Sequence, residues 1–557
     1  MNSWLINEKT HCKTFSTLHY VKMMQAALAV FVVLNFIAIA IAVFIPYHIS
    51  NGISLLDMTN LSNSLWFFYV LVIVVLLEYV IGIITSNLNI RLSSKTAMQI
   101  EFDVLRHIKK SEFVDLGKHS DAHLTQRINN DSVCIGDFII EKVPYFVNNL
   151  ITVLLIIPLL FSMSLFLGII GIVVVVIYFS IYIAVKHMYY RLNKSMLESQ
   201  NAFFSTMSDV LYNILAIKLN FWYNETDKLF VKNATRFFSD SIKFLRLEVV
   251  HAKTISLLSR AAYAFAIFII VHSSSSSNNV AAIGGAFVAV VMYIELLFPA
   301  LEKLSAFGGQ LQRYKVSRDR IGELYDFKLE ASGDVLPDGI DTIICKDVKI
   351  EINGREIFSI EKAELQKGRI YLVQGKNGSG KTTFTLTLAG IYKLNAGEIV
   401  FNGDTSLQLD LFSARKCLFS FAQQDPYFQG GSIKYNLALS GIDESGIDVK
   451  IKEKKLPLLS FIEHLPNGFD TEITPKNTKL SGGEKQRISL TRAMIKKASV
   501  YIFDEPSNAL DTNSVDVFIE ELLELKKEAI VLLISHDARF DAIADDVIMF
   551  ESCYTTT

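Results

Sequence analysis

An eight-residue run beginning at Gly375 has the composition and spacing of a phosphate-binding loop. It reads Gly-Lys-Asn-Gly-Ser-Gly-Lys-Thr, which fills every fixed position of the pattern G-x-x-x-x-G-K-[ST]. The glycines let backbone N–H groups close around phosphate oxygens, Lys381 supplies a positive charge, and Thr382 offers a hydroxyl to Mg²⁺. The apolar stretch 370–373 predicts a strand before the run, and 383–388 predicts a helix after it. The residues predicted to contact a nucleoside triphosphate at this turn are Gly375, Lys376, Asn377, Gly378, Ser379, Gly380, Lys381, Thr382 and Thr383.

Four more residues with suitable chemistry follow, in a fixed order along the chain. The apolar run 500–503 ends in Asp504 and Glu505, as in a buried parallel strand, whose carboxyl end is where ligands bind. Because adjacent strand residues point to opposite sides, we expect Asp504 near Mg²⁺ and Glu505 toward an attacking water. Gln424 and His536 each follow an apolar stretch, and each signal is weak alone.

The segment 480–487 reads Leu-Ser-Gly-Gly-Glu-Lys-Gln-Arg and is called the signature segment below. Ser481 and Glu484 have the spacing of a helix capping box. The two intervening glycines expose backbone N–H groups at the start of the helix, where geometry and dipole favour an anion. An ordinary capped helix is the alternative, because one capping box does not exclude it.

Most of the chain before residue 300 is apolar. Hydrophobic residues make up 51 % of the whole sequence and the mean hydropathy is +0.34, which argues against a wholly soluble protein. A spanning helix needs about 20 mostly apolar residues. The runs that meet this requirement are 24–46, 65–84, 146–163, 165–185, 255–271 and 281–297.

Lysine and arginine orient these runs. The long segments after the second and fourth runs are rich in both residues, whereas the loops near 52–60 and 273–279 carry none. The positive-inside rule therefore puts both long segments, and both termini, in the cytoplasm. Their helical periodicity predicts that the spanning helices extend into the cytoplasm and turn back near 115–122 and near 218–228.

Charge and cysteine content exclude other classes of partner and cofactor. A net charge of −2 argues against a nucleic-acid partner, which would require a basic face. No two cysteines have the spacing of a metal site, so we expect all five to be reduced and unpaired. They are Cys12, Cys134, Cys345, Cys417 and Cys553.

Three ionisable side chains fall inside the predicted spans: Glu78, Arg260 and Glu295. Ionisable residues inside a membrane are candidates for function, so these three could line a cavity for a polar or charged solute. The alternative is that they extend toward the membrane surface or pair with one another.

The ordered set resembles the nucleotide-binding domain of ABC transporters. The six spans with two long cytoplasmic segments resemble the half-transporter of type I ABC exporters (type IV fold), and the likeness covers about 22–549. The implied fold class is an α-helical polytopic membrane domain of six transmembrane helices followed by an α/β P-loop NTPase (ABC ATPase) domain. The implied boundaries are a cytoplasmic segment 1–23, a transmembrane domain 24–325, a linker 326–340 and a nucleotide-binding domain 341–557.

The resemblance also implies a role for each residue of the set. Glu505 is the expected catalytic carboxylate, His536 the switch histidine, and Gln424 a contact to Mg²⁺ and the attacking water. Residues of the signature segment are expected to reach the γ-phosphate of an ATP bound by a partner subunit. Outside the phosphate loop, the expected ATP contacts are Ser481, Gly482, Gly483, Asp504 and Asp511, and the expected Mg²⁺ contacts are Thr382, Gln424 and Asp504.

Two positions depart from the family pattern. Ile352 stands where the family has an aromatic residue that stacks on adenine, so stacking by this residue is absent. The stretch 473–478 lacks the Gly-Glu pair that precedes the signature segment in family exporters, so coupling between domains is expected to use other contacts.

In the family each ATP lies between the phosphate loop of one domain and the signature of another, so one chain cannot complete a site. We expect a homodimer in the cytoplasmic membrane, with a heterodimer as the alternative. The expected activity is ATP-driven export of a small antimicrobial peptide or natural product. The alternatives are a lipid or lipid-linked saccharide flippase, a drug efflux pump and a siderophore importer. A non-pumping regulator or channel is disfavoured by Glu505 and His536.

Overall fold

The computed structural model describes residues 15–54, 61–117, 121–274, 280–330, 333–352, 354–453, 456–473 and 480–550. The chain forms two compact units, and each is described by itself. The helical bundle comprises Met1–Arg106 and Asp121–Asp326, and the ATPase unit comprises His107–Ser120 and Phe327–Thr557.

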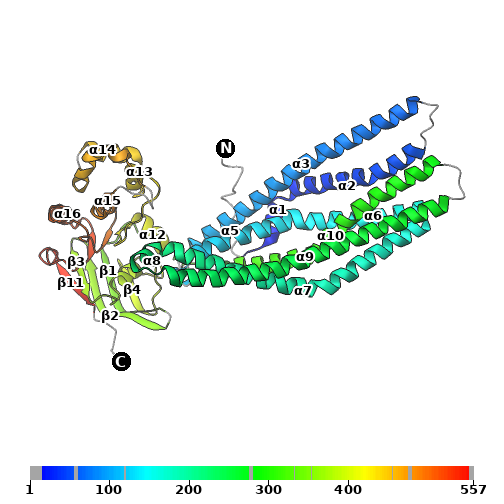
Figure 1. The fold of residues 1–557 in the computed structure, drawn as a ribbon. Helices are drawn as coiled ribbons and strands as arrows, with labels where there is room; N and C mark the ends of the chain where they lie inside the picture. Colours follow the sequence, from blue (N-terminus) through cyan, green and yellow to red (C-terminus); the bar gives the residue numbers. More distant parts are fainter. Residues whose placement is uncertain are drawn as a thin grey trace. The chain divides into compact units, whose positions relative to one another are not determined.

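The bundle consists of long helices (Figure 1). Its elements are α1 (Thr17–Met23), α2 (Gln25–Ser54), α3 (Leu61–Ile108), α5 (Asp121–Asp137), the π-helical turn η2 (Phe138–Lys142), α6 (Val143–Met163), α7 (Leu165–Tyr212), α8 (Ile214–Asn220), α9 (Tyr223–Ser274) and α10 (Val280–Tyr325). Six helical stretches are long and apolar enough to span a membrane, which confirms the six predicted spans.

The spanning helices continue well beyond a bilayer. Helix α3 has 48 residues and is therefore about 72 Å long, against about 30 Å for the hydrocarbon core. Helices α7, α9 and α10 are of similar length, which confirms the predicted helical extensions. A short helix lies at each far turn: α4 (Phe113–Leu116) after α3, and α8 between α7 and α9.

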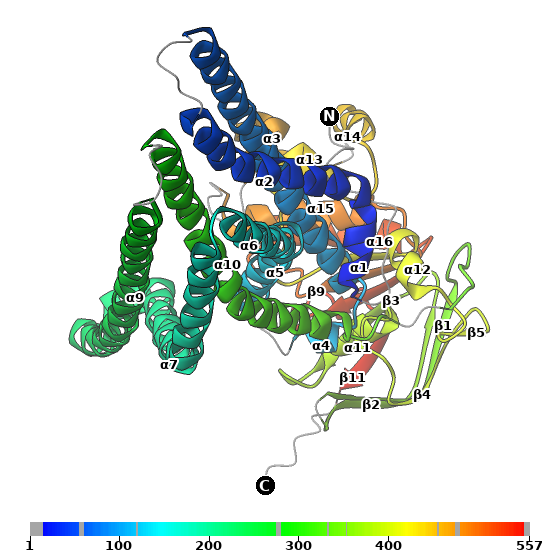
Figure 2. The ribbon, with the colours of Figure 1, turned by 90° about the vertical axis from the view of Figure 1, so that its right-hand side faces the viewer.

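Helix α10 is the centre of the bundle. It packs against α2, α5, α6 and α9, and Figure 2 shows α6 and α10 between α2 on one side and the α7–α9 pair on the other. Gly285 lets α10 approach α2 closely, because a Cβ at this position would lie 2.3 Å from the Ser50 carbonyl oxygen. Close backbone contact at small residues is a usual way for membrane helices to associate.

Buried polar contacts join α5 to the far end of α10. The Asp131 carboxylate accepts a hydrogen bond from the Ser317 hydroxyl at 2.8 Å and pairs with Arg320 at 3.2 Å. Arg127, one turn earlier in α5, pairs with Glu323. Removing one partner would leave the buried charge of Arg127 or Asp131 without its ion pair, which is strongly destabilising.

The ATPase unit contains a parallel sheet and an antiparallel sheet. The five-stranded parallel sheet has the order β11 (Asp546–Phe550), β3 (Ile370–Gly375), β10 (Ile530–Ile534), β9 (Val500–Asp504) and β6 (Phe419–Ala422). The four-stranded antiparallel sheet has the order β2 (Arg355–Gln366), β1 (Thr342–Ile352), β4 (Ala396–Phe401) and β5 (Asp404–Thr405). Strands β3, β9 and β10 are almost entirely buried, as their apolar runs predict.

Helices and short strands complete the ATPase unit. They are α11 (Lys381–Leu388), α12 (Leu411–Cys417), β7 (Gly431–Ser432), α13 (Ile433–Ala438), α14 (Glu444–Lys452), η3 (Pro457–His464), η4 (Gly468–Asp470), β8 (Glu472–Ile473), α15 (Gly482–Ile495) and α16 (Thr512–Leu525). The three cysteines among the described residues, Cys134, Cys345 and Cys417, are free, as predicted.

Because α2 and α10 approach closely at only one of two glycines of α10, we expect alanine substitutions at the two positions to differ in their effect on stability. Gly285→Ala forces a Cβ against the Ser50 backbone, so we expect it to lower stability by about 1–3 kcal/mol. Gly309→Ala is the control, because a Cβ there meets nothing within 4 Å, and we expect a change of less than about 1 kcal/mol. Thermal unfolding of the purified protein in detergent measures both, and equal effects would refute the steric explanation.

Candidate functional site

The phosphate loop joins β3 to α11, as predicted. Gly375, Gly378 and Gly380 have φ values of 151°, 80° and 91°, a region that side-chain-bearing residues rarely adopt. At Gly375 there is also no room for a side chain, because a Cβ would lie 2.5 Å from the Phe550 carbonyl oxygen. The helix begins at Lys381, two residues earlier than the sequence pattern indicates.

The Lys381 side chain folds back onto the phosphate loop and contacts its backbone. Its Nζ donates to the carbonyl oxygens of Gly375 at 2.6 Å and Lys376 at 3.2 Å, and it lies 3.3 Å from His536 Nε2. The side chain is buried, so its charge acts in a medium where water screens it weakly. Phosphate oxygens entering the loop would meet this ammonium group.

Asp504 and Thr382 form a pair of oxygen donors next to Lys381. Asp504 ends β9, and its carboxylate accepts a hydrogen bond from the Thr382 hydroxyl at 2.7 Å. Burial raises the pKa of Asp504, and the Thr382 hydrogen bond and the Lys381 charge offset part of this. A carboxylate and a hydroxyl beside a triphosphate site suit Mg²⁺, which prefers oxygen ligands.

Glu505 adopts a backbone conformation that the strand interpretation did not predict. It is the first residue past β9 and has φ +49°, so it does not continue the strand alternation that was expected to separate it from Asp504. Its N–H donates to the Ile534 carbonyl oxygen at 2.8 Å, which stabilises this turn. A left-handed glutamate is uncommon, and such backbone strain is concentrated at functional sites.

Glu505 and His536 lie close enough to act on one water molecule. Glu505 Oε1 is 3.9 Å from His536 Nε2, and the glutamate side chain is largely buried whereas the histidine is exposed. Burial raises the pKa of Glu505; the His536 side chain lowers it and the neighbouring Asp504 raises it further. A carboxylate with a raised pKa beside a phosphate site has the properties of a general base.

Gln424 and the signature segment lie apart from these contacts. Gln424 is exposed on a bend just after β6, beside β9 in the sheet. The predicted capping box is confirmed: the Glu484 N–H donates to Ser481 Oγ at 3.3 Å, and the Ser481 N–H donates to the Glu484 carboxylate at 2.6 Å. The start of α15 at Ser481 and Gly482 is exposed.

The segment after Glu505 packs against the signature segment. A Cβ at Gly483 would lie 2.4 Å from the Ala509 carbonyl oxygen, so only glycine fits beside this residue. Ala509 has φ +65°, and Asp511 begins α16 by accepting the Ser514 N–H at 2.7 Å. Nothing in the sequence pattern indicated the contact between Gly483 and Ala509.

The two departures from the family pattern have different outcomes. Ile352 ends β1 and packs, half-buried, against the core of the ATPase unit, so an aliphatic side chain occupies the position. The residues of 473–478 other than Ile473 lie outside the described residues.

The structure does not join Glu78, Arg260 and Glu295. They lie on α3, α9 and α10, and among the described residues no ion pair links any two of them. Glu295 is exposed and lies within electrostatic range of Tyr263, one turn from Arg260 on α9. Glu78 is half-buried on a helix with few contacts inside the bundle.

Another charged cluster, missed in the sequence, lies where α6 begins. Glu141 and Lys142 form an ion pair in η2, and both act electrostatically on Tyr145 one turn later. Lys303 of α10 places its Nζ 5.7 Å from the centre of the Tyr145 ring. Two lysines thus flank one tyrosine, and the signal was missed because Lys142 and Lys303 lie outside the predicted spans.

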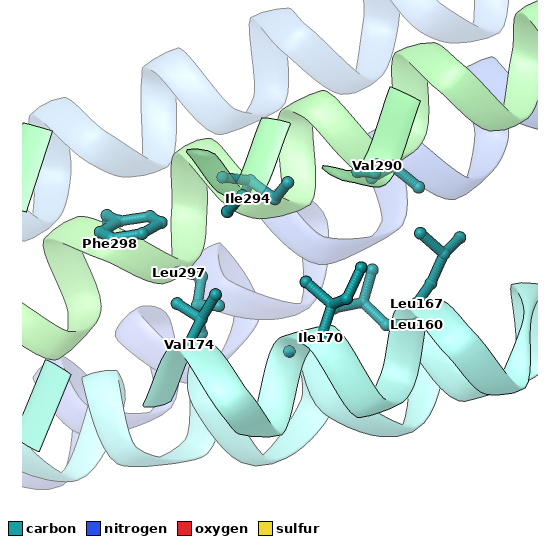
Figure 3. Close-up of a pocket in the computed structure, with 11 residues that line it drawn as sticks. Leu160, Leu167, Ile170, Val174, Val290, Ile294, Leu297 and Phe298 are labelled. Carbon is teal, nitrogen blue, oxygen red and sulfur yellow. The ribbon is translucent and has the colours of Figure 1, made fainter. Parts of the chain in front are cut away.

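A small cavity between α6, α7, α9 and α10 has only apolar walls. Figure 3 shows Ile170 and Val174 of α7 pointing toward Ile294 and Leu297 of α10. The cavity holds about 10 Å³, the limit for one water molecule. It is a packing gap of the bundle and leaves no space for a solute.

Comparison with known proteins accounts for both units. The family model "ABC transporter transmembrane region" matches residues 28–301, and the model "ABC transporter" matches residues 361–508. Two similar relatives are both ATP-dependent lipid A-core flippases. That of Francisella tularensis (strain SCHU S4) is 24 % identical over 83 % of this chain and 76 % of its own length, and that of Haemophilus influenzae (strain 86-028NP) is 23 % identical over 87 % and 83 %.

A solved structure shares the fold along nearly the whole chain. The bacterial Atm1-family ABC exporter with ATP bound superposes with a TM-score of 0.80 at 18 % identity, covering 96 % of each chain.

The opposite environments of Asp504 and Asp511 predict opposite effects of two matched substitutions. The folded state raises the pKa of Asp504, so its ionised form costs stability, increasingly as pH rises above the pKa of the unfolded chain. Asp504→Asn removes that cost and should raise the unfolding temperature at neutral pH. Hydrogen bonds from Ser514 lower the pKa of Asp511, so Asp511→Asn should lower the unfolding temperature at neutral pH, and less so in acid.

Thermal unfolding of both variants between about pH 2 and about pH 8, a range that includes the titration of aspartate, tests this pair. If both substitutions changed the unfolding temperature in the same direction at neutral pH, burial of Asp504 would not be what decides its contribution to stability.

Proposed function

We propose that this chain, which belongs to the ABC exporters with a membrane domain and an ATPase domain fused in one polypeptide, works as a homodimer. The ABC exporter fold implies a dimer in the membrane. The observation that carries the proposal is the exposed start of α15, which takes no part in the hydrogen bonds described among Lys381, Thr382, Asp504 and His536. A second copy would place this anion site on the γ-phosphate.

ATP hydrolysis in this dimer uses the residues at the carboxyl edge of the parallel sheet. The phosphate loop and Lys381 would hold the phosphates, and Thr382 and Asp504 would provide oxygens for Mg²⁺, which would neutralise charge on the triphosphate. Gln424, exposed on the bend after β6, is the third Mg²⁺ contact expected from the family. Glu505 takes a proton from the attacking water, and His536 orients the site beside it. Loss of the γ-phosphate weakens the contact between the two copies and resets the bundle.

The catalytic assignment predicts a clean separation of binding from turnover. Glu505→Gln keeps the shape of the side chain but removes the base, so ATP binding should persist and hydrolysis should fall by at least about 100-fold. Trapped dimers should accumulate with Mg·ATP. ATPase assays and light scattering measure the two effects, and full turnover in this variant would eliminate Glu505 as the base.

The wild-type pH profile provides an independent check. Because burial raises the pKa of Glu505, turnover should decline on the acidic side at a higher pH than an ordinary glutamate would cause.

For the transported solute, we infer an amphipathic lipid with an anionic head. Lys303 places its ammonium group beside the Tyr145 ring where α6 begins, and a positive charge beside an aromatic ring at a membrane boundary suits a phosphorylated headgroup. Lys142, which pairs with Glu141, lies one turn before Tyr145. The lipid A-core named for the two relatives is a solute of this class. The lysines would lie on the cytoplasmic side, with both termini and the ATPase unit, by the positive-inside rule.

A cationic peptide is the second candidate. Glu295 and Glu302 lie two helical turns apart on α10, and both are exposed on that helix. Two acids along one face would favour a positively charged solute, in keeping with the antimicrobial peptide expected from the family. Drug efflux and siderophore import have no comparable observation in their favour.

Solute-stimulated ATPase activity in lipid discs distinguishes the candidates. If the lipid proposal holds, anionic glycolipid stimulates turnover and Lys303→Gln raises its half-maximal concentration about tenfold. Lys315→Gln is the matched control, an exposed lysine elsewhere on α10. Stimulation by cationic peptides that Glu295→Gln weakens, with no response to the glycolipid, would replace the lipid by the peptide.

A further inference from the structure

Within the ATPase unit, the segment after α3 pairs with the segment after α10. Residues 110–112 and 328–330 form an antiparallel bridge with backbone hydrogen bonds of 2.7 and 2.9 Å. The Asp115 carboxylate of α4 accepts the Lys328 N–H at 3.3 Å, and Phe113 packs edge-on against Tyr392. The two segments that lead directly out of α3 and α10 are therefore held as one strap.

A partly buried ion pair, together with the Phe113–Tyr392 contact, attaches this strap to the rest of the ATPase unit. The Glu330 carboxylate accepts a hydrogen bond from the Arg415 guanidinium in the last turn of α12. Their side chains are only 12 % and 17 % exposed, so water screens the attraction weakly. A charge-assisted hydrogen bond of this kind fixes the orientation of the two side chains as well as the distance between them.

Arg415 also contacts the ends of α11 and α15, the helices that follow the phosphate loop and the signature segment. Its Nη1 donates to the carbonyl oxygen of Ala389, the C-cap of α11, at 3.5 Å. Its own carbonyl oxygen accepts from Nζ of Lys496, the C-cap of α15, at 3.0 Å. Helix α11 begins at the phosphate loop and α15 begins at the signature segment, and the C-caps of both helices contact Arg415.

We propose that the Arg415–Glu330 ion pair couples nucleotide binding to the membrane helices. Arg415 is a positioning residue: it moves with the ends of α11 and α15, and Glu330 passes that displacement to the strap and hence along the chain into α3 and α10. The inference rests on the proposed function and supplies a contact for coupling in a chain that lacks the Gly-Glu pair before the signature segment. Physical continuity alone does not demonstrate coupling, so the ion pair must be broken without disturbing the fold.

The decisive variant is the double substitution Glu330→Gln with Arg415→Gln. Removing both charges avoids leaving one buried charge unpaired, so the protein should fold with an unchanged unfolding temperature. ATP affinity and basal hydrolysis should also be unchanged. Hydrogen exchange in α3 and α10 is measured with and without Mg·ATP on the full-length protein in lipid discs. The change in exchange rate that Mg·ATP causes in these helices should be about tenfold smaller in the double variant than in wild type.

Two matched variants accompany it. Lys346→Gln with Glu398→Gln removes an exposed ion pair between β1 and β4 of the same unit and should leave the change in exchange rate at the wild-type value. Arg415→Lys keeps a positive charge for Glu330 and should retain most of that change.

Each result bears on the proposal. A change in exchange rate of wild-type size in the double variant overturns it, as does a parallel loss of ATP affinity, which would show that the ion pair only supports the nucleotide site. If the wild-type protein binds and hydrolyses ATP but Mg·ATP does not change hydrogen exchange in α3 and α10, then the proposed transport cycle is wrong, and the coupling proposed for the ion pair is wrong with it.

Discussion

The negative charge of a bound triphosphate is the constraint around which the ATPase unit is arranged. Parallel strands end at a common edge, so β3, β9 and β10 bring a glycine-rich loop, two carboxylates and a histidine to one place. The same edge holds Asp504 and Glu505, whose pKa values are raised by partial burial. Thr382, Lys381 and His536 lie close to these acids and offset part of the cost of burying them.

Most of this arrangement could be predicted from the sequence, because each element has a local pattern. The six spans follow from apolar length, the phosphate loop from its glycines, and the start of α15 from a capping box of four residues. The left-handed turn at Glu505 could not be predicted in this way, since a strand pattern carries no information on the residue that follows the strand. Its conformation depends on the Ile534 carbonyl oxygen, contributed by a strand nearly thirty residues later.

Contacts between distant segments were also beyond the sequence. Glu330 and Arg415 are ordinary charged residues in ordinary surroundings until the fold buries them together, and the bridge between 110–112 and 328–330 joins segments more than two hundred residues apart. The same limit explains why Glu78, Arg260 and Glu295 were grouped in the sequence, although they lie on three helices and no ion pair joins any two of them in the described part of the chain. Hydropathy identifies which residues enter the bilayer but not which faces of the helices meet.

The π-helical turn between α5 and α6 has a consequence for how this bundle can vary. A wide turn holds about one residue more than an α-helical turn, and one residue corresponds to about 100° of rotation around the axis. The polar face that α5 presents to α10 and the face that α6 presents within the membrane are therefore set independently, although the backbone runs on without a break. Loss or gain of a single residue at this joint would turn the whole of α6 to new neighbours while leaving the Asp131 contacts in place.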